Sequence, residues 1–316
     1  METRKLYYED PFQKGFATTV VSCDAVKGGY AVVLAETAFY PEGGGQPYDT
    51  GVLGEANVLE VHEKNGVITH LCDKPFEVGK SVSGKIDWAR RFDHMQQHSG
   101  EHICSGLICE RFHCDNVGFH MGADVVTIDF NADISWDELM EIEQLANLYI
   151  YEDHPIDIQF YRGAELDKVE YRSKKPLEGD VRIVSFPGAD CCACCGTHVV
   201  RSGQVGLVKF LSVQKFRDGV RIELLSGKRA HRYLSECWAQ DVRIAQALSV
   251  KPNASFAGVE RVLAELSALK QRCAKLEESV FAQTAAQYEG KGDVLLFEDE
   301  MSGDSLRKLC DAVTNH

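Results

Sequence analysis

The segment DWARRFDHMQQHSGEHICSGLICERF, residues 87–112, decides how the chain is divided. Apolar residues recur in it at near-helical spacing, which predicts a helix from Asp87 to about Phe112. His98 and His102 are four residues apart, so both imidazoles lie on one face of that helix. Such a pair suits a tetrahedral metal, and zinc is its commonest occupant, although this spacing also arises often by chance.

A second group of metal-binding side chains follows about 90 residues later. Cys194 and His198 are also four residues apart, in a turn that contains Gly196. Together with His98 and His102 they form a coherent ligand set for one Zn²⁺ per chain. Four protein ligands can close the shell of a structural zinc, whereas a catalytic zinc usually keeps one position open, so both alternatives stand here.

The other thiols near this turn allow a different interpretation. Cys191 with Cys194, or Cys192 with Cys195, forms a CxxC pair, which can be redox-active near a helix N-terminus. The preceding residues 186–190, FPGAD, are not the strand-to-helix entry of a thioredoxin-type motif. We therefore favour metal binding over thiol redox chemistry.

Short β-branched or alternating runs fill the region before the helix. They occur at residues 17–22, 30–34 and 67–71 and predict a small antiparallel β-barrel over residues 1–88, with a sandwich as the alternative. Within it, three glycines precede Gln46. This stretch is either a flexible hairpin or a loop whose backbone approaches a ligand closely, with Gln46 presenting its amide.

Helix and strand alternate in mixed order after residue 88, which predicts an α+β domain over residues 89–230. Ser135 and Glu138 have the spacing of a capping box and indicate a second helix over residues 135–151. The expected strands occupy residues 156–161, 182–186, 206–214 and 219–225.

The remaining chain is predicted to be mainly helical, in two pieces broken near Pro252. Apolar residues of the second piece alternate at spacings of three and four over about three heptads. This predicts a coiled coil or helical hairpin over residues 231–288, able to form a homodimer, with an amphipathic helix packed on its own domain as the alternative. Residues 289–316 hold one expected strand, 294–297, and one helix, 304–313. We expect them to begin a further small α/β domain rather than to form a docking appendage.

The composition excludes several classes of protein. With 34 Lys+Arg, 48 Asp+Glu and a net charge of −14, the chain is not a general nucleic-acid coat protein. No apolar run approaches the ~18 to 20 residues of a membrane span. The N-terminal stretch METRKLYYEDPF lacks an apolar segment after its charges, so we expect a cytoplasmic protein. Neither GxxxxGK[ST] nor GxGxxG occurs, so nucleotide-phosphate binding has no support.

Three ordered motifs resemble a known family. The glycine-rich loop ending in Gln46, Arg90-Arg91 before the two helical histidines, and the Cys194-to-His198 motif are similar to the editing region of alanyl-tRNA synthetase and its free-standing AlaX relatives. The similarity continues through residues 206–225 and covers most of the chain. The synthetase's class II aminoacylation domain is absent, so we expect the long free-standing form.

The resemblance implies zinc-dependent deacylation of tRNA(Ala) mischarged with serine, and with glycine as a further substrate. His98, His102, Cys194 and His198 match the family's zinc positions, and Gln46 matches its loop glutamine. Between the histidines the family often has Thr-Ala-Thr, whereas this chain has Ser99-Gly100-Glu101. We expect Gln46 and Ser99 to act in the catalytic site by recognising the serine hydroxyl. The competing hypothesis is a non-catalytic tRNA-binding or structural zinc module.

A basic stretch follows the second pair of ligands. Residues 201–232 hold eight basic and two acidic side chains, which is either an ordinary solvated face or a surface for the phosphates of the acceptor stem. We expect the tRNA contacts to come from this stretch and from the start of the helix. The residues concerned are Arg90, Arg91, Lys209, Lys215, Arg217, Arg221, Lys228 and Arg229.

Overall fold

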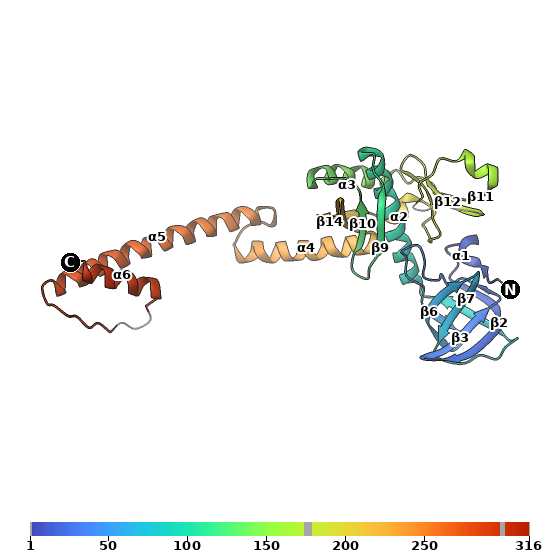
Figure 1. Cartoon of the computed structure of the whole chain (residues 1–316), viewed down its shortest axis with the longest axis horizontal. Helices are drawn as coiled ribbons and strands as arrows, with labels where there is room; N and C mark the ends of the chain where they lie inside the picture. Colours follow the sequence, from blue (N-terminus) through green and yellow to red (C-terminus); the bar gives the residue numbers. More distant parts are fainter. Residues whose placement is uncertain (1, 174–178, 298–300, 316) are drawn as a thin grey trace. The chain divides into compact units, whose positions relative to one another are not determined.

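The computed structural model describes residues 2–173, 179–297 and 301–315 (Figure 1). The chain divides into two compact units, Met1–Leu234 and Ser235–His316. Helices and several separate sheets alternate along it, which confirms the predicted α+β class. Among the described residues, no helix is both long enough and apolar enough to cross a bilayer.

Six strands near the N-terminus form a closed barrel in the order β2-β3-β7-β6-β5-β8. They are β2 (Gly15–Val26), β3 (Gly29–Leu34), β5 (Gly51–Leu53), β6 (Ala56–Lys64), β7 (Val67–Cys72) and β8 (Ser81–Ile86). Alternate residues face the interior, as Phe16 and Val20 do on β2. The enclosed core includes the fully buried Val61 and Ile68. A short parallel pair, β1 (Arg4–Lys5) with β4 (Glu36–Thr37), and the one-turn helix α1 (Leu6–Glu9) complete this region.

Helix α2 (Trp88–Phe112) is the helix that the opening segment predicts. Asp87 caps it, because its side chain accepts a hydrogen bond from the Arg90 N–H. The helix packs on an antiparallel sheet of order β14-β15-β10-β9. The strands are β9 (Asn116–Met121), β10 (Val126–Phe130), β14 (Val208–Phe216) and β15 (Gly219–Ser226). Buried side chains of α2, such as Ile103 and Ile108, form the core beneath this sheet.

Helix α3 (Trp136–Tyr151) also packs on this sheet and begins with the predicted capping box of Ser135 and Glu138. A separate antiparallel sheet of order β11-β12-β13 follows it. Its elements, with the short 3₁₀ turns around them, are β11 (Asp157–Arg162), η1 (Gly163–Lys168), β12 (Asp180–Phe186), β13 (Asp190–Ala193) and η2 (Ser202–Val205). Helix α2 contacts β13, so the end of this small sheet lies against the helix that carries the two histidines.

The C-terminal region is helical. Helix α4 (Gly227–Ala247) and helix α5 (Ser255–Tyr288) are separated by η3 (Pro252–Ala254), where the sequence predicts the break. Helix α6 (Gly303–Thr314) packs on the end of α5 and buries Phe281 and Leu309.

One expectation for this region is corrected. Residues 294–297 form no strand, and the described residues 235–297 and 301–315 offer no strand to pair with them. The predicted strand over residues 294–297 is therefore wrong, and the described part of this segment contributes the helix α6, which packs on α5. The heptad seam of α5 is not buried by α6, since Leu266, Leu269 and Leu276 are 46%, 56% and 57% exposed.

Candidate metal centre

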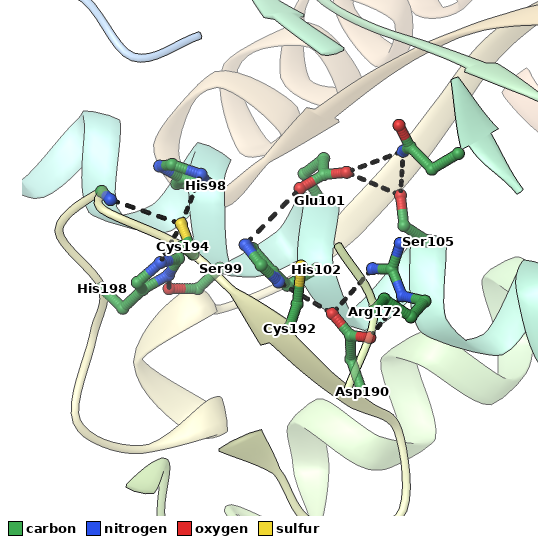
Figure 2. Close-up of polar contacts among 12 residues, drawn as sticks. His98, Ser99, Glu101, His102, Ser105, Arg172, Asp190, Cys192, Cys194 and His198 are labelled. Atoms are coloured by element: carbon green, nitrogen blue, oxygen red, sulfur yellow. Dashed lines mark hydrogen bonds and ion pairs between the residues drawn. The ribbon is translucent and has the colours of Figure 1, made fainter. Parts of the chain in front are cut away.

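The four predicted ligands converge at one point (Figure 2). His98 and His102 come from α2, and Cys194 and His198 from the loop after β13, with all four donor atoms within 4.8 Å of one another. The Cys194 Sγ lies 3.5 Å from His98 Nε2 and 3.3 Å from His198 Nε2. Ligand atoms of a tetrahedral zinc, each 2.0 to 2.3 Å from the metal, are themselves roughly 3.3 to 3.7 Å apart. The donor set therefore fits one zinc ion.

The second nitrogen of each imidazole is held by a hydrogen bond from outside the cluster. When Nδ1 donates such a bond, Nε2 keeps its lone pair for a metal, so these partners select the ligating tautomer. The bonds run from Nδ1 of His98 to Gln46 Oε1 at 2.9 Å, from Nδ1 of His198 to Ser99 Oγ at 3.2 Å, and from Nδ1 of His102 to Asp190 Oδ2 at 2.8 Å.

Gln46 joins the barrel to both halves of the cluster. Besides accepting from His98, its Oε1 accepts from the Thr197 N–H at 3.1 Å, and its Nε2 donates to Thr197 Oγ1 at 2.9 Å. The loop before it approaches β9 closely. Gly45 has a φ of +82°, and a Cβ there would lie 2.5 Å from the Phe119 ring. The glycine-rich loop is therefore held by contacts with the protein itself.

Gly196 lets the second ligand loop lie against α2. A Cβ at this position would lie 2.1 Å from Cε1 of His98. Ser99, one residue after His98, accepts hydrogen bonds from His198 and from the Val199 N–H at 3.2 Å. Ser99 and Gln46, the two residues predicted to be catalytic, are both fully buried. Each is hydrogen-bonded to one histidine of the cluster, Gln46 to His98 and Ser99 to His198.

Asp190 connects the cluster to a buried ion pair. Its two carboxylate oxygens accept from Arg172 at 2.7 and 2.8 Å, and one of them also accepts from His102. Burial raises the pKa of Asp190, but the hydrogen bonds from His102 and Arg172 outweigh burial and hold the pKa below its usual value. Asp190 is therefore a carboxylate that orients His102.

Cys194 is stabilised as a thiolate. Burial raises the pKa of its thiol, but the neighbouring imidazoles, above all that of His98, outweigh burial and bring the pKa well below its usual value. The thiolate is the form that binds a metal. All twelve cysteines are free, so neither CxxC pair is closed as a disulfide.

Three of the four ligands, His98, His102 and Cys194, line a cavity of about 340 Å³. Glu101 lines it too and is only 5% exposed. One of its oxygens accepts from Ser105 Oγ at 2.6 Å, and the other lies 3.9 Å from His102 Nε2. The cavity therefore combines the metal ligands with a carboxylate (Figure 2).

Asn116 also lines this cavity, as do Arg172 and Ser173. Its Nδ2 donates to Glu101 at 3.0 Å and to Ser105 at 2.8 Å, which leaves Oδ1 as the free end of the amide. Oδ1 is buried and has no hydrogen-bond partner within the described part of the chain. Sequence reasoning missed this network. The available signal was that Glu101 and Ser105 are four residues apart and so share one helical face.

Comparisons with known proteins show which sequences the chain resembles. The chain is 31% identical to the alanyl-tRNA editing protein AlaX-L of Pyrococcus horikoshii, over 93% of this chain and 74% of that protein. It is 30% identical to the alanyl-tRNA editing protein Aarsd1-A of Xenopus laevis, over 90% of this chain and 73% of that protein. The chain belongs to the family of alanyl-tRNA editing proteins.

Two family models and a group of longer relatives support this membership. The model for class II (A) tRNA synthetases matches residues 12–90, and that for the second additional domain of threonyl- and alanyl-tRNA synthetases matches residues 181–223. The chain is also 36% identical to the alanine–tRNA ligase of Pyrococcus abyssi. It spans only about a third of the length of the ligases that it matches. The second matched segment contains Cys194 and His198.

The predicted tRNA contacts of this family member are partly corrected. Arg91 is fully buried, where it pairs with Asp49, so the prediction that it contacts tRNA is wrong. Three further cations of the basic stretch are neutralised by carboxylates. Lys209 pairs with Glu143 at 2.7 Å, Arg221 with Asp129 at 2.7 Å, and Arg229 with Asp93 at 2.6 Å.

The other predicted cations lie in two places. Lys215 and Arg217 are exposed at the β14–β15 turn, with Lys215 3.8 Å from Asp133. Arg90 and Lys228 line one cavity together with Arg229. The eight predicted cations therefore do not form one continuous strip.

Proposed function

We propose that this chain hydrolyses the ester of tRNA(Ala) mischarged with serine, in trans and with zinc, and that glycine is a poorer substrate. One observation carries the proposal: three of the four candidate metal ligands line a cavity together with Glu101 and Asn116, and the buried Oδ1 of Asn116 has no hydrogen-bond partner among the described residues. A purely structural zinc has no need of such a cavity. Membership of the alanyl-tRNA editing family supports the same choice.

Each group around the cluster has a role in this reaction. A zinc ion held by the four ligands would polarise the ester carbonyl or lower the pKa of a water molecule. Gln46, Ser99 and Asp190 are positioning residues, because each fixes one imidazole with its Nε2 toward the other ligands. This role replaces direct recognition of serine by Gln46 and Ser99, since neither lines the cavity.

Recognition of the aminoacyl group falls to Glu101 and Asn116. The free oxygen of Glu101 suits the α-ammonium of an aminoacyl ester, since charge-assisted hydrogen bonds are strong. The Oδ1 of Asn116 would accept from the serine hydroxyl. Alanine and glycine lack this hydroxyl and would leave the buried oxygen unpaired, which disfavours both.

The direct test compares hydrolysis of Ser-tRNA(Ala) and Ala-tRNA(Ala). We expect the serine ester to be cleaved faster, and His102→Ala to lose both zinc and activity. His62→Ala is the matched control, because His62 is a 54% exposed barrel histidine outside the cluster. If zinc is bound but neither ester is cleaved faster than without protein, the chain is a non-catalytic module.

A second variant tests the recognition step. Asn116→Ala should reduce the preference for the serine over the alanine ester by about tenfold or more, while zinc content is retained. An unchanged preference would assign discrimination to other groups. Glu101→Gln should reduce cleavage of both esters, because the α-ammonium is common to both.

Two further proposals concern the protein's setting. The exposed heptad seam of α5 is suited to pair with the same seam of a second copy, since parallel or antiparallel helices bury such seams. Sedimentation should show a dimer that Leu269→Asp dissociates, whereas a monomer at all concentrations would refute this. Twelve free thiols fit a reducing compartment, and we propose the cytoplasm.

A further inference from the structure

A second cavity has a volume of about 440 Å³ and is lined in part by Pro47, the residue after Gln46. We name it the basic cavity, and its polar lining is Arg90, Asp93, His94, Lys228, Arg229 and Arg232. The function described above does not use it.

The basic cavity and the cavity of the metal centre are lined by residues from the same three segments. In the glycine-rich loop, Pro47 lines the basic cavity and Gly44 lines the metal-centre cavity. Near β9, Gly122 just beyond the strand lines the basic cavity, and Phe119 within the strand lines the metal-centre cavity. On α2 the corresponding residues are His94 and His98, one turn apart, which is about 6 Å along the helix axis. The two cavities are therefore close enough along α2 for one extended ligand to reach both.

The charge of the basic cavity is positive. Four cationic side chains line it against one carboxylate, Asp93, which Arg229 already neutralises at 2.6 Å. The Nε of Arg90 donates to the Tyr48 carbonyl at 2.9 Å, and Lys228 is exposed. The cations of residues 228–232 also occupy the first turns of α4, where the helix dipole favours anions.

His94 contributes a neutral polar group. Burial, reinforced by the charges of Arg90 and Arg229, lowers its pKa to about 3. Its Nδ1 is buried and has no hydrogen-bond partner among the described residues. The positive charge of the cavity therefore comes from guanidinium and ammonium groups, which match phosphate oxygens in charge and geometry.

We propose that the basic cavity binds a backbone phosphate of the single-stranded 3′ end of the tRNA while the ester occupies the metal centre. This rests on the proposed function, because that function brings a 3′ aminoacyl ester to the neighbouring cavity. The phosphates nearest the ester belong to the last nucleotides of the strand. A phosphate held in the basic cavity would thus fix the direction in which the 3′ end of the tRNA enters the metal centre.

The experiment measures binding of uncharged tRNA(Ala), so it does not depend on ester hydrolysis. Lys228→Gln removes one exposed charge of the cavity, and Lys27→Gln removes an exposed charge from the β2–β3 turn of the barrel as the matched control. We expect Lys228→Gln to raise the Kd roughly fivefold and to reduce the salt slope of log Kd by about 0.7 to 1. Lys27→Gln should leave both unchanged.

Truncated tRNA tests the position of the phosphate. When the last three nucleotides are removed, wild type and Lys228→Gln should bind equally, because the contact has been lost from both. An unchanged Kd of Lys228→Gln for complete tRNA, or an equal loss on truncated tRNA, would overturn the proposal. So would competition by inorganic phosphate at micromolar concentration, which would mark a site for the free anion. If both variants keep the wild-type Kd and the protein still deacylates Ser-tRNA(Ala), phosphate binding in the basic cavity is refuted, whereas the proposed function is not.

Discussion

Two arginine–aspartate pairs, one fully buried and one partly buried, hold the first unit together in different ways. Arg91 and Asp49 are both fully buried and join α2 to the barrel. Arg172 and Asp190 lie beside the metal centre, where the Arg172 side chain is 28% exposed. The first pair is completed by main-chain groups: Arg91 also donates to the carbonyls of Pro11 and Ala38, and Asp49 accepts from the Tyr40 N–H. The second pair is completed by His102.

The difference lies in what the carboxylate is used for. Every contact of Asp49 is to the scaffold, so this pair fixes the position of the barrel. Asp190 accepts a hydrogen bond from His102, a member of the candidate metal cluster, so its charge raises the basicity of that imidazole. An arginine–aspartate pair therefore fixes the scaffold in one place and orients a histidine of the candidate metal centre in the other.

The largest effect is expected from breaking the scaffold pair. Arg91→Ala should lower the free energy of unfolding by about 3 to 5 kcal/mol, because it leaves Asp49 charged, buried and unpaired. Urea unfolding followed by tryptophan fluorescence measures this. The double variant Arg91→Met with Asp49→Leu should recover much of the loss, since no buried charge remains. A loss below about 1 kcal/mol for the single variant would contradict a structural role.

A buried histidine of the barrel, His70, sharpens the contrast with His102, because its ring nitrogens lie 2.9 Å from Thr37 Oγ1 and 3.1 Å from the Val32 carbonyl. Burial lowers the pKa of His70 in the barrel to about 4, against 6.5 in the unfolded chain, although its hydrogen bond to Val32 opposes this. The unfolded chain therefore binds the proton first, and stability is lost as the pH falls from 6.5 to 4. The loss should be about 3 kcal/mol. His70→Gln should remove that part of the pH dependence, and an identical pH profile would contradict this assignment.

Weakening the second pair should affect metal binding more than folding. Asp190→Asn should lower zinc affinity by about 10- to 100-fold, because His102 loses its charged partner. Competition with a zinc chelator measures this. Asp129→Asn breaks the pair with Arg221 outside the cluster and should leave zinc affinity unchanged. Equal loss in both variants would mean that the effect is a general destabilisation.

An exposed ion pair should show the smallest effect. Arg111 of α2 and Glu141 of α3 are 3.5 Å apart with both side chains more than 60% exposed. Solvent screening and side-chain entropy cancel most of the attraction in such pairs. Glu141→Gln should therefore leave the urea midpoint and zinc affinity unchanged. If Glu141→Gln shifted the urea midpoint as much as Arg91→Ala does, solvent exposure would not explain how much each ion pair contributes to stability.

The His/Cys cluster could be predicted because its signal is local. Both ligand pairs are four residues apart, and chemistry links a Cys and three His without knowledge of the fold. The capping box of α3 is equally local. Strands β9 and β10 were not predicted, because short runs broken by Gly122 and Asp124 give a weak pattern.

The rest depends on partners that are distant in the sequence. Arg91 looks like a surface cation until the barrel brings Asp49, 42 residues away, to it. Lys209 is neutralised by Glu143, 66 residues away. Counting charges along residues 201–232 therefore overestimated the free positive charge. Glu101 was given no role because the sequence does not show that Asn116 and Ser105 enclose it.

The position of Gln46 has a consequence for biosynthesis. Its amide contacts one residue 52 positions away and another 151 positions away, so the cluster closes only when three distant segments meet. A ribosome-bound chain cannot assemble these contacts before His198 has left the exit tunnel. Assembly of the four-residue His/Cys cluster is therefore a late event in synthesis, and a nascent chain that ends before Cys194 holds only two of the four donor groups.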